Sequence, residues 1–238
     1  MTLSEPEIGA VIATLVRTGG LAATAPLIGD PGVSLRARLM FVLAIGLSVG
    51  AARPGLPFAE LPLAAVVELA VGLITGLCAR FVLAQVAIAG QLMGLSIGLG
   101  FASQYDVHAG ESAGTLRTML MALAGLAFIS VGGFDAMVRS VAAGPAHVGQ
   151  LALLGPELVR AGTSAFGNGL ALAAPLVLAA LVANIGLAVM NRAAPAANVF
   201  SIALAGVLIL GGVVLLATAA HLVAGITEAA RASTQHLE

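Results

Sequence analysis

Two long stretches of this sequence, residues 161–191 and 193–227, contain no Asp, Glu, Lys or Arg. A predominantly apolar stretch of about 20 residues is already long enough to cross a bilayer as a helix. A single arginine, Arg192, separates the two stretches. This arrangement predicts a helical hairpin that lies in a membrane.

The rest of the chain is similarly poor in charge. Of its 238 residues, 60% are hydrophobic and 9% are charged, whereas an average soluble domain carries about 25% charge. In lipid the backbone must satisfy its own hydrogen bonds, which leaves helices or closed barrels. Apolar runs such as residues 207–210 lack the alternation of barrel strands. We therefore predict an all-α, polytopic membrane protein.

Turn residues divide the chain into about six long apolar helices. The predicted helices are residues 8–25, 35–52, 60–85, 115–134, 166–191 and 198–225. Ser34 is placed to cap the second helix, and residues 135–160 form the longest predicted polar connection. Residues 60–102 as one helix would measure roughly 60 Å, twice the hydrocarbon thickness. We therefore expect residues 86–102 to form a separate, re-entrant helix.

Three glycines in that re-entrant segment, Gly90, Gly94 and Gly98, recur at every fourth position. This spacing puts them on one helical face and lets another backbone approach closely. The partner in such a contact is either another helix of the same chain or a helix of a neighbouring subunit.

The sequence offers no catalytic or metal-binding constellation. There is no Lys for a phosphate-binding loop, and Cys78 is the sole cysteine, so no disulfide framework or thiolate metal site is possible. The four histidines are far apart in the sequence: His108, His147, His221 and His236. The net charge of −1 gives no electrostatic support for nucleic-acid binding. We predict a protein that is not an enzyme and needs no cofactor or metal.

Three charged residues, Arg17, Glu68 and Arg80, lie inside apolar segments, where facing lipid would be costly. One interpretation is an ion or proton path. The other is that they pair with each other, or with partner subunits, inside an assembly. A single acid among them favours pairing over a proton relay.

Several local sequences resemble one protein family. They are residues 24–29 with 33–38, residues 94–106, and residues 190–195 with 198–200. Their order and spacing also agree, and nearly the whole chain is covered. The sequence thereby resembles the FliR family, the flagellar branch of the type III secretion export-gate proteins, whose injectisome relatives are called SctT. It departs from the usual pattern at Val107, Phe134 and Ala196.

The resemblance implies a core subunit of the flagellar type III export gate in the bacterial inner membrane and flagellar basal body. With FliP-like and FliQ-like subunits it would form a channel for unfolded export substrates. Residues 1–160 would be the FliP-like part and residues 161–238 the FliQ-like hairpin. The turn with Arg192 and Pro195 would contact an FlhB-like switch protein. The implied pore plug contains Phe101, Gln104, Tyr105, Asp106, His108 and Glu111.

Two alternatives of function stay open. The chain could belong to an injectisome, as a paralogue of the same gate. It could also be a small-solute secondary transporter that acts alone, although such transporters build their sites from internal repeats and broken helices, and no obvious repeat is present here. A membrane enzyme that acts on lipids is a weaker third hypothesis, because it would need a cluster of acids or histidines.

Overall fold

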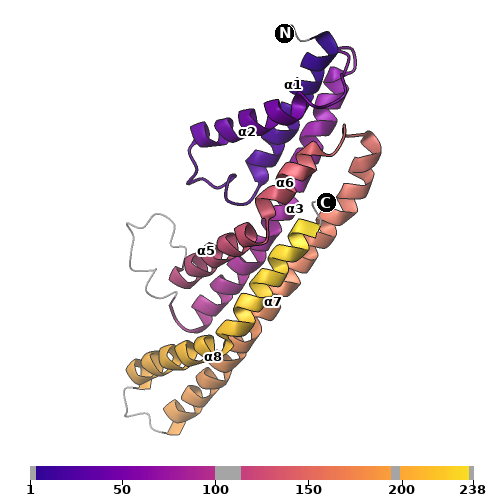
Figure 1. The fold of residues 1–238 in the computed structure, drawn as a ribbon. Helices are drawn as coiled ribbons and strands as arrows, with labels where there is room; N and C mark the ends of the chain where they lie inside the picture. The colour runs from indigo at the N-terminus through magenta and orange to yellow at the C-terminus, as the bar shows by residue number, and fades with distance from the viewer. Residues whose placement is uncertain (1–3, 100–113, 194–198, 236–238) are drawn as a thin grey trace. The chain divides into compact units, whose positions relative to one another are not determined.

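The computed structural model describes residues 4–99, 114–193 and 199–235, with no side chains described for 199–204 and 235. All regular structure in these ranges is helical, which confirms the predicted fold class. Figure 1 labels the helices, which are α1 (Glu5–Thr24), α2 (Leu35–Gly50), α3 (Leu61–Ser96), α5 (Thr115–Ser130), α6 (Gly133–Ala142), α7 (Val148–Ala193) and α8 (Val199–Gln235).

The first two helices begin at serines that take part in capping. The hydroxyl of Ser34 accepts a hydrogen bond from the Ala37 N–H at 3.3 Å, which confirms the predicted cap of α2. At α1 the backbone N–H of Ser4 donates to the carboxylate of Glu7 at 2.6 Å. Each hydrogen bond satisfies a backbone N–H near the start of a helix, where the helix offers no carbonyl partner.

Among the described residues, three helices are long and apolar enough to cross a membrane: α3, α7 and the Ala205–Thr234 part of α8. The bent pair α5 and α6, with 57° between its two helices, would add a fourth if it formed one span. Helix α2 has 16 residues, fewer than the roughly 20 that a span needs, and α1 carries Glu5, Glu7 and Arg17. The predicted six spans are therefore too many.

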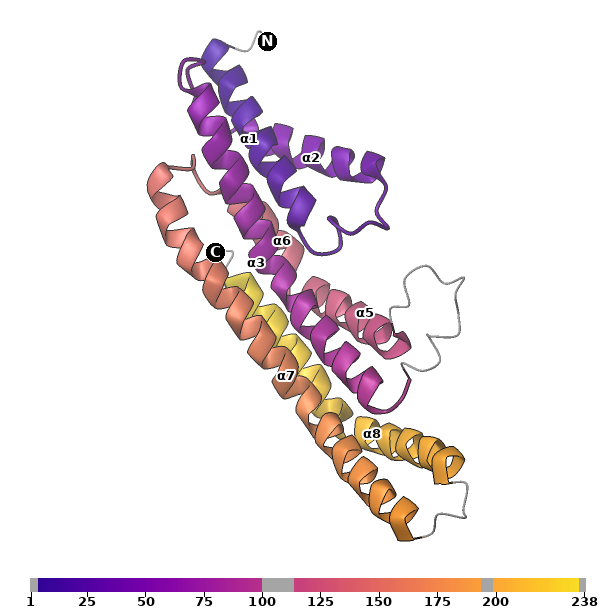
Figure 2. The same ribbon diagram turned by 180° about the vertical axis from the view of Figure 1, so that it is seen from behind.

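Helix α3 runs without a break from Leu61 to Ser96, as Figure 2 shows. The predicted separate helix at residues 86–102 is therefore wrong as far as Ser96, and residues 100–102 lie outside the described part. The sequence has no proline or turn cluster between Arg80 and Gly90, so hydrogen bonding continues through the segment. Its Val86 and Met93 side chains are buried rather than facing lipid.

The region after α5 also differs from the prediction. Helix α5 ends at Ser130, and Gly132 has a φ of 85°, a left-handed conformation that glycine adopts at little cost. Helix α6 then occupies most of the first half of the predicted polar connection, and α7 begins at Val148 instead of near Phe166. The N–H of His147 donates to the Gln150 side chain at 3.3 Å, a local contact that marks this earlier start.

The chain forms two compact units that do not follow its linear order. The first consists of Met1–Val82, Ala127–Ser164 and Ala229–Glu238, and the second of Leu83–Leu126 and Ala165–Glu228. The division at residue 160 that the family resemblance implies stays a prediction, because it concerns likeness to two partner families.

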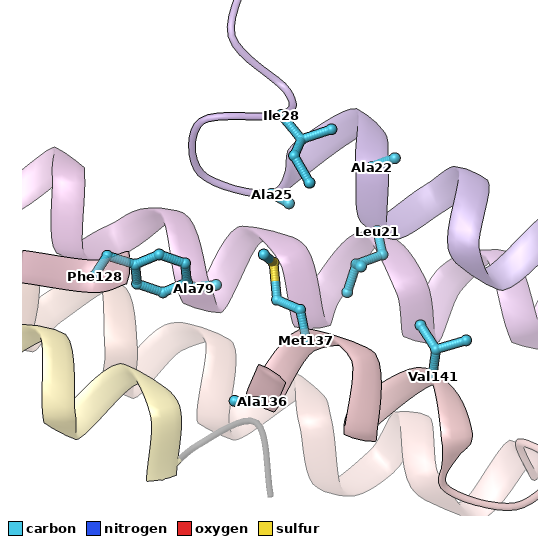
Figure 3. Packing of buried hydrophobic residues seen from close by; sticks show 9 residues of the cluster. All are labelled: Leu21, Ala22, Ala25, Ile28, Ala79, Phe128, Ala136, Met137 and Val141. Atoms are coloured by element: carbon cyan, nitrogen blue, oxygen red, sulfur yellow. The ribbon is translucent and has the colours of Figure 1, made fainter. Parts of the chain in front are cut away.

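The apolar core of the first unit joins α1, α3, α6 and the end of α5 (Figure 3). Phe128 and Met137 are completely buried there, and side chains of α2 such as Phe41 and Ile45 pack against the cluster. The Phe128 and Phe134 rings meet edge to face, with their centres 6.3 Å apart. The core members are Leu21, Ala22, Ala25, Ile28, Ala79, Phe128, Ala136, Met137 and Val141.

Glycines let α1 and α3 approach closely within the first unit. A Cβ on Gly20 would lie 2.8 Å from the carbonyl oxygen of Leu69, and one on Gly72 would overlap the carbonyl oxygen of Arg17. The Thr24 hydroxyl bridges the two helices by donating to the Leu73 carbonyl at 3.0 Å. This close approach brings Arg17 of α1 against the first turns of α3.

In the second unit, contacts between helices are made by glycines and apolar side chains. A Cβ on Gly90 of α3 would lie 2.7 Å from the Cα of Arg117 in α5. A Cβ on Gly169 of α7 would lie 2.7 Å from the Gln85 carbonyl oxygen. Leu172 of α7 fills the space beside Gly225 of α8. Small residues therefore set the helix spacing in this unit, as is typical of membrane helices.

Candidate functional site

Three charged side chains meet inside the first unit. Glu68, on the second turn of α3, receives Arg17 of α1 at 3.3 Å and Arg53, from the connection before α3, at 3.0 Å. All three side chains are at most 6% exposed. Charges buried this deeply are stable only when paired and hydrogen-bonded. The predicted pairing of Arg17 with Glu68 is thus confirmed.

Both arginines also bind the C-terminal end of α6. Arg17 donates to the Ser140 carbonyl at 2.5 Å, and Arg53 donates to the Val141 carbonyl at 2.6 Å. Each also reaches the carbonyls of Ala143 and Gly144, which follow the helix. The last carbonyls of a helix lack partners within it and carry partial negative charge. The end of α6 therefore compensates the excess of one positive charge in the cluster.

Glu68 also ties the start of α7 to this arrangement. Its carboxylate accepts a hydrogen bond from the N–H of Ala146 at 2.9 Å, two residues before α7 begins. One carboxylate thus joins α1, the connection before α3, and the connection between α6 and α7. This charge network holds these backbone segments together. Within it, both Arg17 and Arg53 pair with Glu68.

Sequence reasoning missed Arg53, which lies between the second and third predicted helices. The only signal was that Arg17 and Glu68 lie in apolar helices and need partners. Nothing in the local sequence around Arg53 indicates that a turn residue would fold back onto α3.

A cleft of about 610 Å³ opens beside the network. Its walls come from α1, the connection before α3, the first turns of α3 and the start of α7, all within the first unit. Ala10, Ala13 and Val67 give it apolar lining, and the ion-paired Arg53 and Glu68 also line it. Glu60 and His147 also line it.

Arg80, the third charge predicted inside an apolar segment, is not part of the network. It pairs with Asp30, from the turn after α1, at 2.8 Å. Both side chains are about one third exposed (35% and 31%), so the pair resembles a surface ion pair, which contributes little stability.

The structure separates the predicted packing glycines by environment. Gly90 lies against α5, Gly94 has no atom within 4 Å of where a Cβ would be, and Gly98 has a φ of 83° in the turn after α3. Gly94 is nevertheless buried, and its contact with a neighbouring subunit stays a prediction.

The remaining predicted site residues fall at or beyond the edges of the described part. The plug residues Phe101 to Glu111 all lie outside it, and so does Pro195. Arg192 is exposed in the last turn of α7. In the described ranges no three His, Cys, Asp or Glu side chains gather in a way that would hold a metal.

Comparison with known proteins identifies the family of this chain. A family model described as bacterial export proteins, family 1, matches residues 8–232. The chain belongs to this family of export proteins. The match includes every helix except the first residues of α1 and the last residues of α8.

Curated relatives of this export protein carry one name. The chain is 29% identical to "Flagellar biosynthetic protein FliR" of Escherichia coli (strain K12), over 79% of this chain and 76% of that protein. It is 30% identical to the protein of the same name from Pectobacterium carotovorum subsp. carotovorum, over 78% of this chain and 74% of the other. For the Aquifex aeolicus (strain VF5) protein the identity is 33%, over 67% and 63%. The predicted resemblance to the FliR family is confirmed.

Proposed function

We propose that the protein is a core subunit of the flagellar type III export gate and forms, with FliP-like and FliQ-like subunits, the channel for unfolded export substrates. The supporting observation is the export-family match over residues 8–232, together with relatives named flagellar biosynthetic protein FliR. The proposal places the protein in the bacterial inner membrane, within the flagellar basal body, with several membrane-spanning helices.

Unpaired apolar faces support a subunit role. In α7 the side chains of Leu178, Val182, Ile185 and Val189 are more than half exposed and recur at intervals of three and four. Only 22% of the most apolar window of α7 and 17% of that of α8 are buried by the chain itself, against 39% for α3. Such a hairpin needs lipid or neighbouring helices to cover it.

Within the gate, residues 101–113 act as the plug of the central pore, and the turn at Arg192 and Pro195 is the contact for an FlhB-like switch protein. Both roles rest on the family resemblance. A role as a channel subunit rather than as an enzyme rests on the same resemblance.

Co-purification from native membranes tests the proposal. An affinity-tagged chain should be recovered with two other small, apolar membrane proteins in a fixed ratio. Recovery alone or as a homodimer, with uptake of a metabolite into vesicles, would instead favour the secondary transporter. The genes of the co-purified proteins would also decide between a flagellar gate and an injectisome paralogue.

Electrical recordings test the plug. Deletion of residues 104–112 should leave recovery of the complex unchanged and make membranes that carry it conduct small ions. A deletion of similar length in the connection before α3 (residues 52–59) should prevent folding instead, because it removes Arg53. Unchanged conductance in a normally assembled complex would rule out the plug.

A further inference from the structure

The outer face of helix α2 is apolar and uncovered, and the proposed gate function assigns it no role. Four of its residues recur at intervals of four, three and four, so they lie on one side of the helix. All four are exposed, and they form what we call the outer row: Arg36, Met40, Leu43 and Leu47. The outer row is thus an apolar strip with a positive charge at its first position.

The opposite face of α2 is fixed within the first unit. A Cβ on Gly50 would lie 2.9 Å from the Cα of Val11 in α1, so the two helices approach closely there. The side chains of Phe41 and Ile45 pack against the apolar core. These contacts set the rotation of α2 about its axis, and the outer row is turned away from the rest of the unit.

The two arginines of α2 differ in their partners. Arg38 donates to the backbone carbonyls of Ile28 and Asp30, both at 3.2 Å. Arg36 is exposed and has no hydrogen bond or ion pair among the described residues, and α2 contains no Asp or Glu that would neutralise it. The outer row therefore presents an unpaired positive charge beside apolar side chains. An anionic head group attached to acyl chains complements both features.

The length and direction of α2 favour the surface of a membrane over a span. Helix α2 has 16 residues, fewer than the roughly 20 that a span needs. In Figures 1 and 2 it runs across the direction of α1 and of the first part of α3, and α3 is long and apolar enough to cross a membrane. A helix that runs across a spanning helix lies closer to the membrane plane. Interfacial helices bury an apolar side at the boundary of head groups and acyl chains.

We infer that the outer row of α2 binds the surface of a bilayer that contains anionic phospholipid. Met40, Leu43 and Leu47 enter the upper part of the acyl region, and the side chain of Arg36 extends to a head-group phosphate. A neighbouring subunit that covered the same row would keep lipid away from it, so the two partners are distinguishable by experiment.

Fluorescence quenching in vesicles tests this inference. The chain contains no tryptophan, so Leu43→Trp introduces a single probe at a position that is 49% exposed. The full-length variant is reconstituted in phosphatidylcholine vesicles, in which a small fraction of either phosphatidylcholine or phosphatidylglycerol carries bromine on the upper part of its acyl chains. Both brominated lipids should quench the probe. Half-maximal quenching should need about fivefold less phosphatidylglycerol, because one basic residue near the surface attracts an anionic lipid by about this factor.

Three further variants localise the contact. Phe41→Trp places the probe on the inner face of the same helix and should be quenched much less by either lipid. Arg36→Gln, combined with Leu43→Trp, should keep the quenching and remove the preference for phosphatidylglycerol. Arg160→Gln makes the same change of net charge at an exposed position of α7, and in the same combination it should keep the preference.

Each contrary result overturns the inference. Absence of quenching in Leu43→Trp would show that the outer row does not meet lipid. Equal quenching by the two lipids, or a preference that survives Arg36→Gln, would remove the anionic head group. The measurement is repeated on the assembly that co-purifies with the chain, and quenching that disappears only there would give the outer row to a neighbouring subunit. Because the chain alone is also measured, failure of the gate proposal would leave this test intact.

Discussion

Both units pack through glycines and apolar side chains, and the first unit also contains a network of buried charges that joins distant segments. In the first unit, Glu68 alone joins four parts of the chain. In the second unit, α7 and α8 keep long apolar faces exposed, including Ile209, Val213 and Leu216. The first unit therefore contains the polar partners that its buried charges need, whereas the exposed apolar faces of both units, such as Leu35 and Met40 of α2 in the first, need lipid or other subunits to cover them.

The largest expected effect comes from breaking the charge network. Glu68→Ala leaves Arg17 and Arg53 buried without their carboxylate, and loss of one partner of a buried ion pair costs about 3 to 5 kcal/mol. The free energy of unfolding, measured by titration with a denaturing detergent, should fall by this amount.

A control within the same unit is Asp135→Ala. It removes an exposed pair with Arg139 on α6, which contributes about 0.5 kcal/mol or less. If both substitutions lowered the free energy of unfolding equally, the buried network would stabilise the first unit no more than an exposed ion pair does.

Substitutions of two glycines of α3 test contacts within the chain and contacts between subunits. Gly90→Leu should destabilise the isolated chain by about 1–3 kcal/mol, because its side chain would press on the backbone of α5. At Gly94 a Cβ would have no atom within 4 Å, although the residue is buried, so Gly94→Leu should destabilise the isolated chain less than Gly90→Leu while blocking co-purification of the gate.

The measurements are the unfolding free energy of the chain alone and the yield of the complex. A Gly94→Leu variant that assembles normally would show that no neighbouring subunit packs closely against Gly94 in the gate. A Gly90→Leu variant as stable as the parent would show that α5 can move away from α3.

A smaller effect is expected at the partly exposed pair of Asp30 and Arg80. Solvent screens both side chains, so the coupling free energy between Asp30→Ala and Arg80→Ala should be about 1 kcal/mol or less. A double-mutant cycle measures it directly. A coupling as large as that expected at Glu68 would mean that the turn after α1 is as firmly fixed as the network.

The sequence predicts the helical membrane class and the family well, because both are written in contiguous residues. Charge-free runs such as residues 161–191 need no tertiary information to indicate a span. The segment around Gly94 carries the family resemblance in the same local way. The cap at Ser34 is similarly local, and it is confirmed at 3.3 Å.

Predictions failed where distant contacts or helix continuity decide the outcome. The role of Arg53 follows from the turn before α3 folding onto Glu68 and the end of α6, and no spacing in the sequence encodes that contact. The predicted break after Gln85 relied on membrane thickness, whereas the backbone simply continues its hydrogen bonding. The count of six spans treated α1 and α2 as crossings, although charge and length make both unsuitable.

The smallest expected effect concerns the first turn of α1. The hydrogen bond that the Glu7 carboxylate accepts from the backbone N–H of Ser4 lowers the pKa of Glu7 below its ordinary value. A carboxyl group with a lower pKa in the folded chain adds stability above its unfolded pKa, and this contribution disappears as the pH falls through the folded pKa. Hydrogen exchange at the Ser4 amide, corrected for its intrinsic pH dependence, should therefore lose protection in the acidic range. Glu7→Gln should abolish this dependence and Glu5→Gln should keep it. Because the contact is local and exposed, neither substitution should change the free energy of global unfolding. A lower free energy of global unfolding in Glu7→Gln would mean that the start of α1 stabilises the first unit as the charge network does.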